Sequence, residues 1–115
     1  MSTAAAATSH EAGAGSFSLA AAGGGRYAAV GPLTFANARR AHELGERLLK
    51  AADGAALEID CAGLTASDSA GLAVLIDWLG TAKHAGRRLT YSHLPSGVDA
   101  LARISEVEEL LTRGV

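Results

Sequence analysis

The chain has 115 residues and a formal net charge of −2, with ten basic and twelve acidic residues spread along it. It has no cluster of basic residues that could release counterions from a nucleic acid, which argues against a nucleic-acid partner. A single cysteine, Cys61, excludes a disulfide within the chain and fits a reducing, cytoplasmic setting. The longest apolar run, Ala70 to Ile76, is far too short to cross a bilayer.

The beginning of the chain differs from the rest in composition. Residues 1–15, MSTAAAATSHEAGAG, are almost all small and cannot bury enough apolar surface to offset the entropy lost on folding. This segment also lacks the basic start and the apolar middle of a signal peptide. We therefore expect a disordered leader over 1–15 and one folded domain over 16–115.

The first half of the folded part predicts a hairpin followed by a helix. Residues 16–21 and 26–30 are short apolar segments on either side of Gly23–Gly25, which is typical of two strands joined by a turn. A helix is expected over 35–52, with Thr34 as its N-terminal cap. Its apolar residues recur at helical spacing: Ala41, Leu44 and Leu48.

The second half predicts two more strands and three more helices. Residues 57–61 and 88–94 alternate apolar and polar side chains, which is typical of strands that are buried on one face only. The helices are expected over 69–85, after a cap at Ser96, and after the capping-box pattern Ser105–Glu108, the last one ending near Leu111.

The expected fold class follows from strands that are buried on one face only. Strands of a doubly wound parallel sheet are buried on both faces and have continuous apolar sequences, whereas these strands alternate. We therefore expect an α/β fold with two layers: a mixed sheet of four or five strands, with helices packed on one face.

Three small polar residues, Ser67, Asp68 and Ser69, stand directly before the helix expected over 69–85. The simplest interpretation is structural, because Ser69 or Asp68 can cap the helix and satisfy backbone N–H groups that lack an intrahelical acceptor. Ala70 and Gly71 are small, so the first turn of the helix can approach the sheet closely.

The same helix carries more apolar residues than one buried stripe needs. A stripe of four residues accounts for one face: Leu72, Leu75, Ile76 and Leu79. Val74 and Trp78 lie away from that stripe. Two interpretations stay open: they form an exposed binding flank, since tryptophan is enriched at interface hot spots, or the first or third helix covers them.

Enzymatic and metal-binding patterns are missing from the sequence. There is no G-x-S-x-G elbow, no phosphate-binding P-loop and no cluster of metal ligands. A hydrolase with Ser69 as nucleophile would need a histidine base, and no motif links that serine to any of the four histidines: His10, His42, His84 and His93. We expect no enzyme activity, no cofactor and no metal.

Three segments of the chain resemble the STAS domain, a family of bacterial anti-sigma factor antagonists and related transporter modules. The resemblance covers residues 16–111 and rests on LEIDC, GLTASDSAGLAVLIDWLGTAKHAG and RRLTYSHLPSGVDALARIS, in that order. Its most specific element is Asp68-Ser69-Ala70-Gly71-Leu72, which stands between a strand and a helix as in the family.

The resemblance also implies a branch of the family. Antagonists carry Asp-Ser-Ser-Gly-Leu and are phosphorylated by a partner kinase on the second serine, where this chain has Ala70. The pattern Asp-[Ser/Thr]-Ala-Gly-Leu is similar to the small cytoplasmic STAS subunit of the lipid-asymmetry (Mla) ABC transporter, in which the residue equivalent to Ser69 lies at the ATPase contact.

The implied function is therefore a non-enzymatic subunit that binds the cytoplasmic ABC ATPase and reaches the inner membrane only through this partner. The expected contact residues are Ser67, Asp68, Ser69, Ala70, Gly71, Leu72, Val74 and Trp78. The alternative is an anti-sigma factor antagonist that binds a serine kinase, with Ser69 as the candidate phospho-acceptor.

Overall fold

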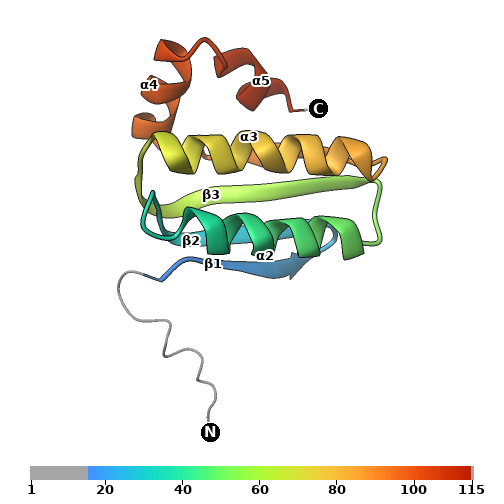
Figure 1. The fold of residues 1–115 in the computed structure, drawn as a ribbon. Coiled ribbons are helices and arrows are strands. Elements are labelled where there is room, and N and C mark those ends of the chain that lie inside the picture. Colours follow the sequence, from blue (N-terminus) through green and yellow to red (C-terminus); the bar gives the residue numbers. More distant parts are fainter. Residues whose placement is uncertain (1–15, 115) are drawn as a thin grey trace, which may run out of the picture.

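The computed structural model describes residues 16–114 and shows a four-stranded sheet with helices packed on one face (Figure 1). The strands lie side by side in chain order: β1 (Ser18–Gly23), β2 (Arg26–Leu33), β3 (Ala56–Ser67) and β4 (Arg88–Ser92). β1 pairs with β2 antiparallel, and β2 with β3 and β3 with β4 parallel. The mixed sheet predicted from the sequence is confirmed, whereas the leader expected over 1–15 lies outside the described residues. The helices are α2 (Ala38–Ala51), α3 (Ser69–His84), α4 (Ser96–Ile104) and α5 (Glu108–Arg113).

The face of the sheet that meets the helices forms the core. Leu57, Ile59 and Cys61 of β3 are buried, and the polar residues between them are not. In the parallel register with β4, Leu89 lies opposite Leu57 and Tyr91 opposite Ile59, so the buried row continues across the two strands. Burial raises the pKa of the Cys61 thiol to about 12, so this thiol stays protonated at neutral pH.

Helix α3 is the central helix of the helical layer. It packs against α2 on one side and against α4 and α5 on the other (Figure 1), and it also contacts β3 and β4 of the sheet. Neighbours on three sides bury more of α3 than a single stripe. Leu72, Leu75 and Leu79 are buried as expected, whereas Ile76 is only partly buried.

The sequence left open whether Val74 and Trp78 of α3 are exposed, and in the structure α2 covers this side of the helix. Val74 is 4% exposed and Trp78 is fully buried. The Trp78 indole N–H donates to the backbone oxygen of His42 at 3.3 Å, and its ring lies 6.1 Å from the ring of Phe17. Gly45 of α2 lies directly against the indole, where a Cβ would overlap it. The covered interpretation is therefore confirmed, and an exposed tryptophan flank is absent.

Helix α2 begins later than expected. Residues 34–37 form a turn in which the Asn37 amide donates to the Thr34 carbonyl at 3.1 Å, so Thr34 does not cap a helix and α2 starts at Ala38. Its fully buried face also differs from the expected one, because Gly45 makes room for the Trp78 ring. The buried residues of α2 are Ala41, Gly45 and Leu49, while Leu44 and Leu48 are half-buried.

The expected caps in the C-terminal part are not formed. Ser96 is the first residue of α4 and makes no cap bond from its side chain. Ser105 ends α4 rather than capping α5, because the chain turns through Glu106 with a φ of 62° and the Val107 amide donates to Ala102 at 2.8 Å.

Candidate functional site

Asp68 joins two segments that are far apart in the sequence. Its Oδ1 accepts a hydrogen bond from the Gly71 amide at 3.0 Å, and its Oδ2 accepts one from the Phe35 amide at 3.0 Å. These two N–H groups, that of Phe35 first, hold the pKa of the Asp68 carboxyl below its ordinary value. Of the two cap residues considered from the sequence, Asp68 is the one that caps α3. Its second oxygen fastens the β2–α2 turn to the helix.

The turn that carries Phe35 is held by further hydrogen bonds. The Thr34 amide donates to Asn37 Oδ1 at 3.0 Å, and Asn37 Nδ2 donates to the Pro32 carbonyl at 2.9 Å. The Ala36 amide donates to Thr34 Oγ1 at 3.3 Å. These hydrogen bonds hold the backbone before and after Phe35, but the Phe35 side chain is 84% exposed. Sequence reasoning placed Phe35 at the start of a helix and missed its exposure.

The residues expected at the contact differ in accessibility. Ser69 is exposed as the first residue of α3, and Ala70 is partly exposed. Gly71 and Leu72 are buried beneath them. The Ser67 hydroxyl oxygen is buried, makes no hydrogen bond to the described residues, and lies beside a 140 Å³ pocket between β3 and α4. A partner can therefore reach only part of the expected set.

The accessible residues form one continuous surface at the beginning of α3. Asp68 precedes Ser69 in the chain and bonds to the turn that carries Phe35, so the three residues are neighbours. The positive end of the helix dipole points to this surface. We call it the α3 N-terminal surface and define it as Phe35, Asp68, Ser69 and Ala70.

Two histidines of the described part of the chain pair with acidic residues away from Ser69. His42 lies 3.4 Å from Asp77, and His93 lies 3.0 Å from Asp60. No hydrogen bond joins Ser69 to a histidine within residues 16–114, so the hydrolase interpretation gains no support.

Within the same residues there is no group of three potential metal ligands. No helix there has the length and apolar character needed to cross a bilayer.

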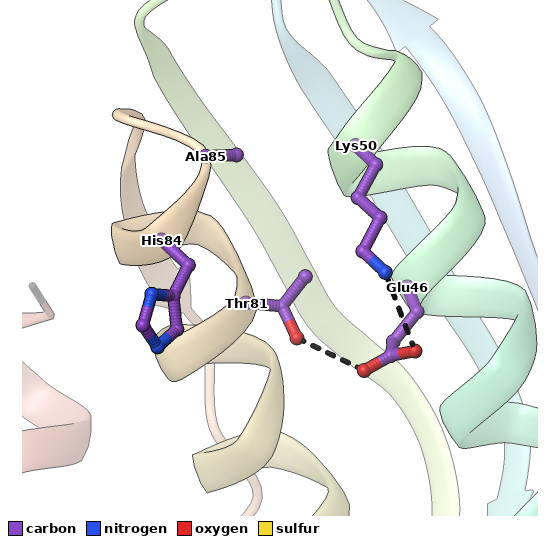
Figure 2. Close-up of a pocket in the computed structure, with 5 residues that line it drawn as sticks. All are labelled: Glu46, Lys50, Thr81, His84 and Ala85. Atoms are coloured by element: carbon purple, nitrogen blue, oxygen red, sulfur yellow. Dashed lines mark hydrogen bonds and ion pairs between the residues drawn. The ribbon is translucent and has the colours of Figure 1, made fainter.

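A second hollow lies at the opposite end of the helices, between the C-terminal halves of α2 and α3. This groove of about 370 Å³ is lined by Glu46, Lys50, Thr81, His84 and Ala85. Figure 2 shows two partners of the Glu46 carboxylate: it accepts from Thr81 Oγ1 at 3.3 Å and pairs with Lys50 Nζ at 3.9 Å. A third partner, His42 Nε2, lies 3.8 Å from the same carboxylate. We interpret these contacts as a polar joint between the helices.

Replacing Asp68 with asparagine should destabilise the protein at neutral pH and have little effect in acid. Because the folded state lowers the pKa of Asp68, its stabilising contribution is fully present above the ordinary value of 3.8 and disappears as the pH falls through the folded-state pKa. Urea unfolding of wild type and Asp68→Asn at about pH 7 and about pH 2 measures this difference. The exposed Asp53→Asn is the control, and an equal loss at both pH values would contradict the assignment.

A family model identifies the family of this chain, and two solved structures have a similar fold. The family model described as "Mlab, STAS domain" matches residues 28–112. No curated protein sequence gives a significant match. The fold is similar to that of the anti-sigma factor antagonist SpoIIAA in its unphosphorylated form, with a TM-score of 0.58, 11% identity and 84% of each chain covered. It is also similar to the Bacillus cell fate determinant SpoIIAA in the phosphorylated form, with a TM-score of 0.61, 10% identity, and 82% of this chain and 86% of that chain covered. Because the family model spans most of the sequence, the chain belongs to the STAS domain family.

Proposed function

We propose that this chain is a non-enzymatic STAS subunit that binds the cytoplasmic ATPase of an Mla-type phospholipid-transport ABC transporter. The observation that carries this proposal is the exposed Ser69 next to Ala70 at the start of α3. The antagonists have a second serine, their phospho-acceptor, where this chain has Ala70. The match to the family model described as Mlab supports the same branch.

The proposed contact needs no chemistry from this chain. Small side chains at Ser69 and Ala70 let a partner approach the first turn of α3, whose positive end already faces the ionised Asp68. Binding would favour one conformation of the ATPase or hold the transporter together. Buried Val74 and Trp78 contribute by keeping α2 and α3 together and not by touching the partner. The protein would then lie in the cytoplasm, at the inner membrane through its partner.

The second candidate is an anti-sigma factor antagonist regulated by a serine kinase. Two observations favour it: the two similar structures described above are of SpoIIAA, and Ser69 is exposed. Phosphorylation of Ser69 would add nearly two negative charges beside the ionised Asp68. The repulsion between the phosphate and the carboxylate would strain the hydrogen bond that Asp68 accepts from the Phe35 amide.

Replacing Ser69 with arginine should weaken binding to the purified ATPase subunit at least about tenfold, because a long charged side chain would obstruct the start of α3. The folded state should tolerate the change, since Ser69 is exposed. Biolayer interferometry against the ATPase from the same organism's transporter measures the effect. Ser105→Arg, at another exposed serine, is the matched control.

A pull-down of the native complex separates the two functions. Recovery of the ABC ATPase and permease by wild type, and their loss with Ser69→Arg, would support the transporter proposal. Recovery of a serine kinase in their place would move the protein to the sigma-factor pathway and make phosphorylation of Ser69 the next measurement. Equal binding by Ser69→Arg and Ser105→Arg would show that the contact lies elsewhere.

A further inference from the structure

We propose that Phe35 is the anchor of the contact at the α3 N-terminal surface and that its ring enters an apolar pocket on the ATPase subunit. The inference rests on the proposed function and names the residue that supplies most of the affinity. Phe35 is 84% exposed, the highest value among the large apolar side chains of residues 16–114. Aromatic side chains with this degree of exposure are uncommon in a folded domain, where most bury their rings.

The core does not require a phenylalanine at this position. Leu33, two residues earlier at the end of β2, is fully buried and fills the space beneath α3. The turn at 34–37 is formed by Thr34 and Asn37 through their own hydrogen bonds, and the Phe35 ring takes no part in them. A polar residue at position 35 would satisfy the same backbone bonds. Folding therefore gives no reason for an aromatic side chain here.

The backbone that carries the ring is fixed before any partner arrives. The Phe35 amide donates to Asp68 Oδ2 at 3.0 Å, which ties the turn to the first turn of α3. The Asn37 side chain bridges the Thr34 amide and the Pro32 carbonyl, which holds the turn from within. An ordered backbone loses little conformational entropy on binding, so more of the burial of the ring appears as affinity.

The neighbours of the ring define the shape that a partner needs. Ser69 and Ala70, at the start of α3, are small and accessible, so the surface combines one exposed aromatic ring with two small side chains. A partner that is flat against α3 and hollow beside it would match both features. In this arrangement the ring is a central, desolvated anchor, the kind of residue that dominates binding energy at protein interfaces.

The test is binding of Phe35→Ala to the purified ATPase subunit by biolayer interferometry. We expect the dissociation constant to rise about thirtyfold or more, which is the range of an interface hot spot. The thermal unfolding midpoint should stay at the wild-type value, because the ring is exposed. Ile104→Ala is the matched control, since Ile104 is 80% exposed on α4, outside the α3 N-terminal surface, and should bind as wild type does.

Failure of the inference and failure of the proposed function give different results. If wild type binds the ATPase, Ser69→Arg does not, and Phe35→Ala binds within about threefold of wild type, the surface is right and the anchor is wrong. If wild type does not bind the ATPase at all, the proposed function falls and the inference falls with it.

Asp68 provides an independent check, because the proposal makes it a positioning residue for Phe35. Asp68→Ala should weaken binding in the wild-type background, since the turn is released from α3. In the Phe35→Ala background the same change should have a smaller effect, because only the loss of the α3 cap at Gly71 remains. An undiminished effect of Asp68→Ala in that background would overturn this role.

Discussion

Replacing Trp78 with alanine should lower the free energy of unfolding by about 3–5 kcal/mol, the range for truncating a large buried aromatic side chain. The Trp78 ring is fully buried where α3 meets α2, and it contacts Phe17 before β1. The truncation would leave a cavity at this junction and remove the N–H donor to the His42 carbonyl. Urea unfolding followed by far-ultraviolet circular dichroism measures the loss, since the variant has no tryptophan fluorescence.

Gly45 provides the control for this prediction. In wild type a Cβ at position 45 would overlap the indole of Trp78, so Gly45→Ala should cost about 1–3 kcal/mol. In the Trp78→Ala background that space is empty, and Gly45→Ala should stabilise α2 by up to about 1 kcal/mol through helix propensity. A destabilising effect of similar size in both backgrounds would show that the ring does not occupy the position described.

Trp78 also shows what helical periodicity can and cannot predict. The spacing of the apolar residues predicted a buried stripe of Leu72, Leu75, Ile76 and Leu79, and all but the partly buried Ile76 are buried. Periodicity does not tell how many neighbours a helix has, because that depends on the packing of distant segments. Since α2 covers one side of α3 and α4 and α5 cover the other, Val74 and Trp78 are buried as well.

The sheet could be predicted because its signal is local. Strict alternation over 57–61 indicated one buried face, and the structure places that face under the helices. Element ends were less predictable, since they depend on competition for hydrogen bonds. The Ser105–Glu108 pattern failed as a capping box because Glu106 turns the chain and the Glu108 carboxylate pairs with Arg103 at 3.4 Å.

Three of the four residues of the α3 N-terminal surface could be located from the sequence. The segment Asp68-Ser69-Ala70 precedes an apolar helical pattern, and this placement alone marks the start of α3. The contribution of Phe35 could not be located, because it depends on a hydrogen bond to Asp68 across 33 positions in the sequence. The signal that was available is an aromatic residue directly after Thr34, in a position that a turn can expose.

Gly71→Ala should destabilise the protein by about 2–3 kcal/mol, even though alanine is the better helix former. Gly71 lies in the first turns of α3, where a Cβ would overlap the carbonyl oxygen of Leu33 at the end of β2 and come within 3.0 Å of its carbonyl carbon. These are backbone atoms of a paired strand and cannot rotate away. The helix would have to shift outward from the sheet. Urea unfolding of the variant measures the cost.

Gly80→Ala is the matched control, because it makes the same change in the same helix. A Cβ at Gly80 has no atom within 4 Å, so this variant should be more stable than wild type by about 0.5–1 kcal/mol. Opposite signs for the two variants would place the cost in the contact between Gly71 and Leu33, since helix propensity is the same in both. Stabilisation of both variants would show that α3 does not approach β2 this closely. A displaced α3 would also separate Ser69 from Phe35, so Gly71→Ala should weaken partner binding while Gly80→Ala leaves it unchanged.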